Sequence, residues 1–192
     1  MEIKTYIDQR WSPRAFSEEK VKKEVLQSVF AAAGRAPSSF NEQPWRYIIG
    51  EKGNSTYDKI LDCLNEWNQK WAISAPILIL ATAAEKFQKN GKDNLHAAYD
   101  LGASVAHLSM KAFEDELYLH QMAGFDAEKA ISSFHIPKNF KAVCAIALGY
   151  QGDPAQLPQS IAETEKGVSE RNAISTYVFG EEWEKTSQLV SE

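Results

Sequence analysis

The stretch APILILAT, residues 75–82, is almost entirely apolar and rich in isoleucine and leucine. A strand without polar alternation is stable only where both of its faces are covered, which is typical of the centre of a sheet. The apolar run, extended to Ala84, is about ten residues long and therefore too short to span a bilayer. We predict a central strand here, with other layers packed on both of its faces.

Helical and strand patterns alternate irregularly on either side of this stretch. The sequence predicts helices over residues 2–9, 17–34, 56–70, 95–117 and 126–134. Apolar residues at helical spacing support the second and third, many small residues mark the fourth, and Asp126 caps the last. Short apolar runs bounded by turn residues predict further strands over residues 45–49, 118–122, 142–150 and 174–179. The polar stretches 85–94 and 151–167 predict loops. This order favours an α+β fold with a central mixed sheet flanked by helices on both faces, in a single domain spanning residues 1–192.

The composition excludes several classes of protein. The chain has 192 residues, 44% apolar and 24% charged, which is ordinary for a globular domain. Its net charge of −5 gives no support to nucleic-acid or anionic-membrane binding. The start, MEIKTYIDQRW, lacks the apolar core of a signal peptide, and the two cysteines have no metal-ligand spacing. We expect a cytoplasmic protein without a metal, a nucleic-acid partner or a membrane partner.

The segment RWSPRAF, residues 10–16, places Arg10, Ser12 and Arg14 within five positions. Arginine offers a rigid fork of N–H donors and serine a short hydroxyl, so together they suit a phosphate monoester. A solvated surface turn is the alternative interpretation. Arg171, between a polar loop and the last predicted strand, is a third candidate, although an exposed loop arginine explains it equally well.

The segment APSSFNEQPW, residues 36–45, is dense in turn-forming and amide residues. Amide side chains can pair with the polar edge of a flat ring, while Phe40 and Trp45 offer apolar surface. A proline-bounded loop between helix and strand is the alternative. The chain contains neither a GxxxxGK loop nor a GxGxxG motif after a strand, so side chains must hold the phosphate of any nucleotide-like cofactor.

Three weaker signals remain. Asn68 is either a ligand or a helix terminus, and Gly124 either allows a backbone to approach a ring closely or forms an ordinary turn. His120 either lines a substrate cavity or is structural. No nucleophile or acid–base pair is recognisable, so we expect no catalytic side chain. This absence suits a redox cofactor that brings its own chemistry.

Several separated segments together resemble the nitroreductase family of FMN-dependent flavoenzymes, in the same order along the chain. They are RWSPRAF, APSSFNEQPW, the Asn68 region leading into APILIL, DLGAS (100–104), HQMAGFD (120–126), AVCAIALGY (142–150), and Arg171 with YVFGEEW. This resemblance implies a nitroreductase-like fold that forms an intertwined homodimer.

The resemblance also implies roles for individual residues. Those matching the phosphate and ribityl contacts of FMN are Arg10, Trp11, Ser12, Arg14 and Arg171. Asn68 matches a contact to the pyrimidine side of the flavin, and the backbone of Ala123 and Gly124 matches a turn near its reactive N5.

A further segment is implied to reach the flavin held mainly by the other subunit. Its residues are Pro37, Ser38, Ser39, Asn41 and Gln43. Each site is then complete only in the dimer.

The implied activity is two-electron transfer from NADH or NADPH through FMN to a small acceptor such as a nitroaromatic or a quinone, by a ping-pong mechanism. Alternatives are a specialised enzyme for reductive dehalogenation or flavin fragmentation, and a non-catalytic FMN-binding protein. Trp71 and Ser169 stand where relatives often carry a basic residue, and the stretch 85–94 is short where some relatives insert a lid.

Overall fold

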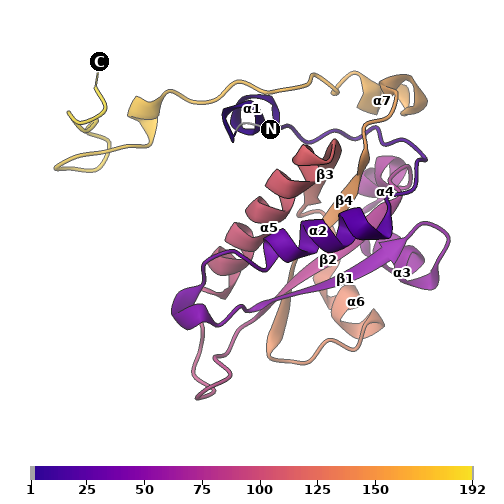
Figure 1. Ribbon diagram of the computed structural model, residues 1–192, viewed down its shortest axis with the longest axis horizontal. Helices are drawn as coiled ribbons and strands as arrows, with labels where there is room; N and C mark the ends of the chain where they lie inside the picture. Colours follow the sequence, from indigo (N-terminus) through magenta and orange to yellow (C-terminus); the bar gives the residue numbers. More distant parts are fainter. Residues whose placement is uncertain (1–2, 192) are drawn as a thin grey trace.

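A four-stranded sheet forms the centre of the structure, a computed structural model that describes residues 3–191. Its strands are β1 (Trp45–Glu51), β2 (Ile77–Ala84), β3 (Leu117–Met122) and β4 (Phe140–Tyr150), in the order β1-β2-β4-β3 (Figure 1). Every residue of β2 is buried, so the prediction of a central strand is confirmed.

All neighbouring strands in this sheet are antiparallel. β2 and β3 run in the same direction, as expected for strands separated by one long helix, but β4 lies between them and is antiparallel to both. No parallel pair therefore forms among the described strands. The α+β class is confirmed, whereas the mixture of pairing directions that we expected within the sheet is not found there.

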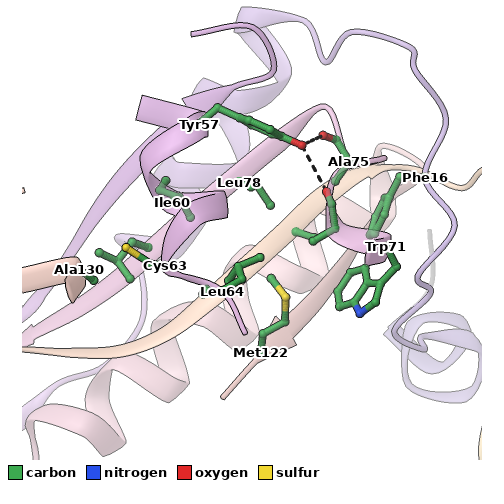
Figure 2. Close-up of a cluster of buried hydrophobic side chains, with 14 of the residues drawn as sticks. Phe16, Tyr57, Ile60, Cys63, Leu64, Trp71, Ala75, Leu78, Met122 and Ala130 are labelled. Atoms are coloured by element: carbon green, nitrogen blue, oxygen red, sulfur yellow. Dashed lines mark hydrogen bonds between the residues drawn. The ribbon is translucent and has the colours of Figure 1, made fainter. Parts of the chain in front are cut away.

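Helices cover both faces of the sheet, as the sequence predicts. On one face α2 (Lys23–Ala33) and α5 (Ala97–Glu114) pack on Ile77, Ile79 and Ala81. On the other face the helices are α3 (Ser55–Cys63), α4 (Glu66–Ala72) and α6 (Ala127–Ser133). They pack around Leu78 and Leu80. Figure 2 shows Leu78 within this layer, near Ile60 and Tyr57 of α3. The alternation of β2 side chains between two apolar layers explains why its sequence shows no polar positions.

The second of these layers is also held by a buried hydroxyl. The Tyr57 side chain donates a hydrogen bond to the backbone carbonyl of Ala75 at 2.9 Å, just before β2 (Figure 2). Tyr57 is 2% exposed, and a buried hydroxyl without a partner would be costly. The bond therefore ties α3 to the start of the central strand.

The predicted start of the second helix is wrong. We expected it at Ser17, but α2 begins at Lys23. The backbone N–H of Ser17 donates instead to the carbonyl of Tyr150 at 3.0 Å, at the end of β4. Pairing with a distant strand has replaced the local helix start. The same helix ends at Ala33, before Pro37, with Gly34 as its C-cap.

The helix predicted over residues 56–70 is two helices. Leu64 is extended and pairs with Phe125, which separates α3 from α4. The Asn65 side chain accepts a hydrogen bond from the N–H of Asn68 at 2.8 Å and so begins α4. An asparagine side chain that caps a new helix competes with continuation of the old one.

The remaining elements agree with the sequence more closely. The first helix is α1 (Ile3–Gln9), and α6 is capped by Asp126, whose carboxylate accepts from the N–H of Lys129. The predicted loop 151–167 contains a short turn, η2 (Pro154–Gln156), and α7 (Gln159–Ala162). A similar turn, η1 (Ser39–Asn41), lies before β1.

The strand predicted over residues 174–179 is wrong. The chain forms the turn η3 (Ile174–Thr176) there, and only Phe179 makes an isolated bridge, with Thr186. Figure 1 shows this C-terminal segment running away from the sheet, so no neighbouring strand is available to it. Within residues 3–191, no helix combines the length and the apolar character needed to cross a membrane.

Candidate functional site

A cavity of about 380 Å³ lies between two segments of the chain. One is the N-terminal arm, residues 10–17, which follows α1, and the other is the C-terminal segment, which begins after α7 and contributes residues 164–171 here. Five of the residues singled out from the sequence line it: Arg10, Trp11, Ser12, Arg14 and Arg171. Four further residues of the C-terminal segment, Thr164, Lys166, Gly167 and Ser169, line it as well, together with His120. The fold thus brings Arg10, Ser12 and Arg14 to the same cavity as Arg171. We call these four residues the phosphate clamp.

The N-terminal arm enters this cavity because α1 ends just before it. The N–H of Arg10 closes the last turn of α1 on Tyr6, and the chain then runs extended towards β4. Arg10 donates to the hydroxyl of Ser12 at 3.4 Å, which keeps the two side chains together. Arg171 donates to the carbonyl of Ser169 at 2.7 Å, within its own loop.

Glu165 holds the two segments together. Its carboxylate accepts hydrogen bonds from the backbone N–H groups of Arg14 and Ala15, the latter at 3.0 Å. It also lies 3.5 Å from the Arg14 guanidinium, and its side chain is only 1% exposed. A buried carboxylate requires such donors, so these contacts fix the C-terminal segment on the arm.

Lysine and arginine dominate the charge around the cavity. Arg10, Arg14, Lys166 and Arg171 line it, and Glu165 is the carboxylate that faces Arg14. The donor set therefore exceeds what one carboxylate can satisfy. This excess of donors and positive charge fits a dianionic phosphate.

His120 forms the wall of the cavity nearest the sheet. One ring nitrogen, Nδ1, lies 2.9 Å from the carbonyl oxygen of Pro13, so the tautomer with a proton on Nδ1 donates there. Burial lowers the pKa of His120, which favours the neutral ring.

Trp71 packs behind His120, with ring centroids 4.4 Å apart, and also stacks near Phe16 (Figure 2). Trp71 is fully buried, and its indole N–H has no hydrogen-bond partner among residues 3–191. It therefore supplies one unused donor next to the residue that lines the cavity.

A second group of predicted residues meets around Gly124. The Asn68 amide donates to the carbonyl of Gly124 at 3.0 Å. A Cβ at Gly124 would lie 2.3 Å from the Asn65 amide nitrogen and 2.7 Å from that of Asn68. We expected Gly124 either to let the backbone approach a ring or to form an ordinary turn; in this chain its backbone lies close to these two amides, which a side chain at Gly124 would force to shift. Ala123 and Gly124 line an open cavity of about 610 Å³ on this side.

The position of these groups along the sheet follows from the strand register. The arm pairs with the end of β4 at Tyr150, and His120 pairs with Ala147. Met122, which leads to Gly124, pairs with Ala145, near the middle of β4. The clamp and the Gly124 turn therefore follow one another along the sheet.

The third group lies at the opposite end of the sheet. Its residues are Pro37, Ser38, Ser39, Asn41 and Gln43. The adjacent Pro44 accepts from Ala84, which pairs with Phe140, the first residue of β4. β4 has 11 residues, so roughly 30 Å separates its two ends. Within one chain this group and the clamp are therefore too far apart to contact the same small molecule.

This third group is held in an uncommon backbone conformation. Phe40, Asn41 and Gln43 have positive φ angles of 53°, 56° and 50°. Such angles are rare outside glycine and require support. The N–H of Ser39 donates to the buried carboxylate of Asp100 at 3.0 Å, which anchors the turn on α5. Phe40, in the middle of this turn, is 91% exposed.

The sequence did not reveal Glu165, Lys166 or His120 as neighbours of the clamp. Glu165 contacts Arg14 across a separation of 151 positions, and the sequence identified its surroundings only as a polar loop. Two adjacent charged residues in a loop carry no signal of burial. The contact between Glu165 and Arg14 forms only because the segment after α7 folds back onto the N-terminal arm.

Comparison with known proteins gives consistent matches. A family model described as the nitroreductase family matches residues 7–67. A crystal structure described as "the oxidoreductase containing FMN" is 30% identical, with a TM-score of 0.88, over 95% of this chain and 93% of that one. A nitroreductase family protein from Clostridium difficile 630 is 24% identical, with a TM-score of 0.73, over 95% and 99% of the two chains.

Two kinds of curated relatives also match. An uncharacterised 15.4 kDa protein of Mycolicibacterium smegmatis is 32% identical, over 72% of this chain and 97% of that protein. Iodotyrosine deiodinase 1 of Sus scrofa is 24% identical over 79% of this chain, and the human protein is 29% identical over 52% of it. The matched region spans 62% and 43% of these two deiodinases.

Proposed function

Since the chain belongs to the nitroreductase family, we propose that it is an FMN-dependent oxidoreductase. Its reaction is the transfer of two electrons from NADH or NADPH to an electron-poor acceptor such as a nitroaromatic or a quinone. The observation that carries this proposal is the meeting of Arg10, Arg14 and Arg171 at one cavity of about 380 Å³. The neighbour that contains FMN, at 30% identity and a TM-score of 0.88, supports the choice of cofactor.

In this proposal the clamp holds the phosphate of FMN. Arg10, Arg14 and Arg171 would donate charge-assisted hydrogen bonds to it, Ser12 would add its hydroxyl, and Trp11 would contact the ribityl chain. The cavity fits a phosphate because its donors exceed the one buried carboxylate. When bound, FMN supplies the two-electron chemistry, which explains why no catalytic side chain is needed.

In this proposal the flavin ring would extend from the phosphate towards the Gly124 turn. Asn68, whose amide donates to the Gly124 carbonyl, would hold the pyrimidine side of the flavin with its remaining amide groups. The backbone of Ala123 and Gly124 would border the ring. Neutral His120 and buried Trp71 lie between clamp and turn and exclude water there. Because Trp71 carries no charge, the ring region holds less positive charge than in relatives with a basic residue at this position.

We propose that the active unit is a homodimer with shared sites, in which each chain is one domain. The segment Pro37–Gln43 lies at the far end of the sheet from the clamp of its own chain, so it would reach the flavin of the partner subunit. The C-terminal segment supports this arrangement, since Tyr177, Trp183 and Leu189 are 61%, 82% and 95% exposed. Apolar side chains at such exposure favour packing against another surface.

The electron donor and the electron acceptor would occupy the same face of the flavin one after the other, which leads to ping-pong kinetics.

We place the protein in the cytoplasm as part of this proposal, because Cys63 and Cys144 are free thiols, as suits a reducing compartment.

A second candidate is reductive dehalogenation, which the iodotyrosine deiodinase relatives favour. The short connection from α3 to α4, at Leu64 and Asn65, and the short loop 85–94 leave little chain for a lid over a halogenated substrate. We therefore rank it behind the broader reductase activity. A flavin-fragmenting enzyme and a non-catalytic FMN-binding protein are the remaining outcomes of the test.

The test is the visible spectrum of the purified protein, followed by anaerobic addition of NADH and of NADPH. We expect a yellow protein that releases FMN on denaturation and is bleached by one or both donors. Reoxidation is then followed with a nitroaromatic, a quinone and an iodotyrosine. A colourless protein, or released FAD, contradicts the cofactor. A yellow protein that no donor bleaches contradicts the activity and leaves a binding protein.

A further inference from the structure

We propose that His120 positions the ribityl chain of FMN, because its Nε2 accepts a hydrogen bond from one of the ribityl hydroxyls. This inference rests on the FMN-dependent function proposed above and extends it to a residue outside the phosphate clamp. Three features of the ring support this role: its tautomer, its access to the cavity, and the scarcity of other acceptors there.

The N-terminal arm sets the tautomer of His120. Nδ1 lies 2.9 Å from the carbonyl oxygen of Pro13, and a carbonyl can only accept, so Nδ1 carries a proton. Burial lowers the pKa of His120, and the charge of Arg14 lowers it further. The hydrogen bond to Pro13 and the charge of Glu165 act in the opposite direction without reversing this shift. At neutral pH the ring is therefore neutral, and Nε2 has a free lone pair.

Nε2 of His120 is open to the cavity. It forms no hydrogen bond with any of the residues 3–191. The buried side-chain nitrogens and oxygens that lack a partner in this part of the chain do not include it, so Nε2 keeps accessible surface. The ring is half-buried, with Trp71 packed against it at 4.4 Å between centroids, and it lines the cavity of about 380 Å³. A ligand in this cavity therefore meets Nε2.

Donors dominate the other side chains around the cavity. Arginine and lysine side chains can only donate, and four of them line it: Arg10, Arg14, Lys166 and Arg171. The Glu165 carboxylate already accepts from Arg14 and from two backbone N–H groups. Nε2 of His120 is thus an acceptor without a partner in a cavity rich in donors, and the ligand that fits must bring a donor of its own.

A phosphate dianion has no proton to donate, so it satisfies the arginines but not His120. The position of His120 along the sheet indicates which part of the ligand reaches it. His120 pairs with Ala147, between the end of β4 at Tyr150, where the arm is bound, and Ala145, which pairs with Met122 next to the Gly124 turn. In FMN the ribityl chain joins the phosphate to the ring, and its hydroxyls are donors.

An imidazolium that donates to the phosphate is the alternative arrangement. The four cations that line the cavity outnumber the negative charges of Glu165 and a phosphate dianion together. The site therefore keeps a positive excess after the phosphate binds, and this excess opposes a further positive charge on His120. A proton on Nε2 in the FMN complex is incompatible with the proposal.

Nitrogen NMR of protein labelled with 15N-histidine tests the tautomer directly. At neutral pH we expect a protonated Nδ1 and an unprotonated Nε2 in His120, both without and with FMN. Addition of FMN should move the Nε2 signal more than the Nδ1 signal, because only Nε2 gains a partner. A protonated Nε2 in the complex overturns the proposal.

Deoxy analogues of FMN, each lacking one ribityl hydroxyl, test the partner of Nε2. The measurement is the quenching of flavin fluorescence on titration with apoprotein. His120→Phe should weaken FMN binding by roughly 2- to 12-fold, the effect of one neutral hydrogen bond. Parent and variant should bind one of the analogues equally, because it lacks the hydroxyl that His120 holds. Equal weakening of FMN and of every analogue assigns His120 a purely structural role and overturns the proposal.

His120→Gln retains an acceptor oxygen, so it should bind FMN more tightly than His120→Phe does. His135→Gln, at an exposed position, is the control and should leave the Kd for FMN unchanged. The NMR measurement on the parent protein keeps the test valid if the His120 variants fail to fold. A parent protein that binds no FMN overturns the proposed function together with this inference. An unchanged Kd for FMN in His120→Phe overturns this inference alone.

Discussion

Glu165 and Ala15, separated by 150 positions, are joined by a hydrogen bond of 3.0 Å from the Ala15 backbone N–H to the Glu165 carboxylate. The same carboxylate oxygen accepts from the N–H of Arg14. This contact holds the C-terminal segment, which carries Lys166 and Arg171, against the N-terminal arm, which carries Arg10 and Arg14. The cavity between them exists because of this connection.

Glu165→Gln should destabilise the fold and loosen the cavity. The amide keeps an acceptor oxygen but loses the charge that strengthens its bonds to two N–H groups and to Arg14. We expect a loss of about 1–3 kcal/mol in the free energy of unfolding, measured by urea denaturation. Glu163→Gln, two positions away and exposed, is the control and should have little effect. Identical unfolding curves for both variants would show that the Glu165 contact contributes nothing.

Arg10→Ala or Arg171→Ala should weaken FMN binding more than it disturbs folding. Loss of one charge-assisted contact to a phosphate costs about 1.5–3 kcal/mol, which corresponds to roughly a 10- to 150-fold rise in Kd. The measurement is the quenching of FMN fluorescence on titration with apoprotein. Arg35→Ala serves as control, because Arg35 lines a different cavity, next to α1 and α5. An unchanged Kd in either clamp variant removes that arginine from the phosphate site.

Gly124→Ala should be destabilising and should disturb the flavin edge of the site. The new Cβ would meet the amide nitrogens of Asn65 and Asn68 at 2.3 and 2.7 Å, and both amides are held by hydrogen bonds at the start of α4. Overpacking of this kind costs about 1–3 kcal/mol. Gly34→Ala is the control, since its Cβ would make only ordinary contacts from 3.5 Å. Both melting temperature and FMN content should fall in the Gly124 variant alone.

His120 should make the protein less stable in acid. Burial lowers its pKa below the ordinary value of 6.5, so the unfolded chain binds a proton before the folded one does. The stability contributed by the neutral ring is complete above about pH 6.5 and is lost as pH falls towards the folded pKa, with a slope of at most ~1.4 kcal/mol per pH unit.

His120→Phe should remove that part of the pH dependence, measured as unfolding free energy between pH 7.5 and 5. His135→Phe, at an exposed position, is the comparison and should leave the dependence unchanged. Parallel curves for the parent and the His120 variant would contradict the assignment.

Complementation tests the shared site. An Arg10→Ala chain and an Asn41→Ala chain, unfolded and refolded together, should form heterodimers in which one site carries both lesions and the other carries none. The activity of this mixture should then exceed that of either variant alone. Activity equal to the mean of the two variants would mean that both residues serve a site within one chain, against the separation of roughly 30 Å along β4.

The sequence by itself determined the elements whose patterns are strong and local. The apolar run of β2 required cover on both faces. The Asp126 cap of α6 and the small-residue pattern of α5 located these helices within two or three residues. The residue types in RWSPRAF were sufficient to suggest a phosphate site, because donor chemistry is a property of the side chains themselves.

The tertiary structure decided whatever depended on distant partners. Ser17 begins no helix because its N–H pairs with Tyr150, and Leu64 interrupts a helix because it pairs with Phe125. Arg171 and Arg10 line one cavity, and Glu165 is buried, because the segment after α7 folds back onto the N-terminal arm. Pro37–Gln43 lies far from the clamp because of the register between β2 and β4. Local sequence cannot encode these, since a buried contact draws its free energy from both partners and only folding brings them together.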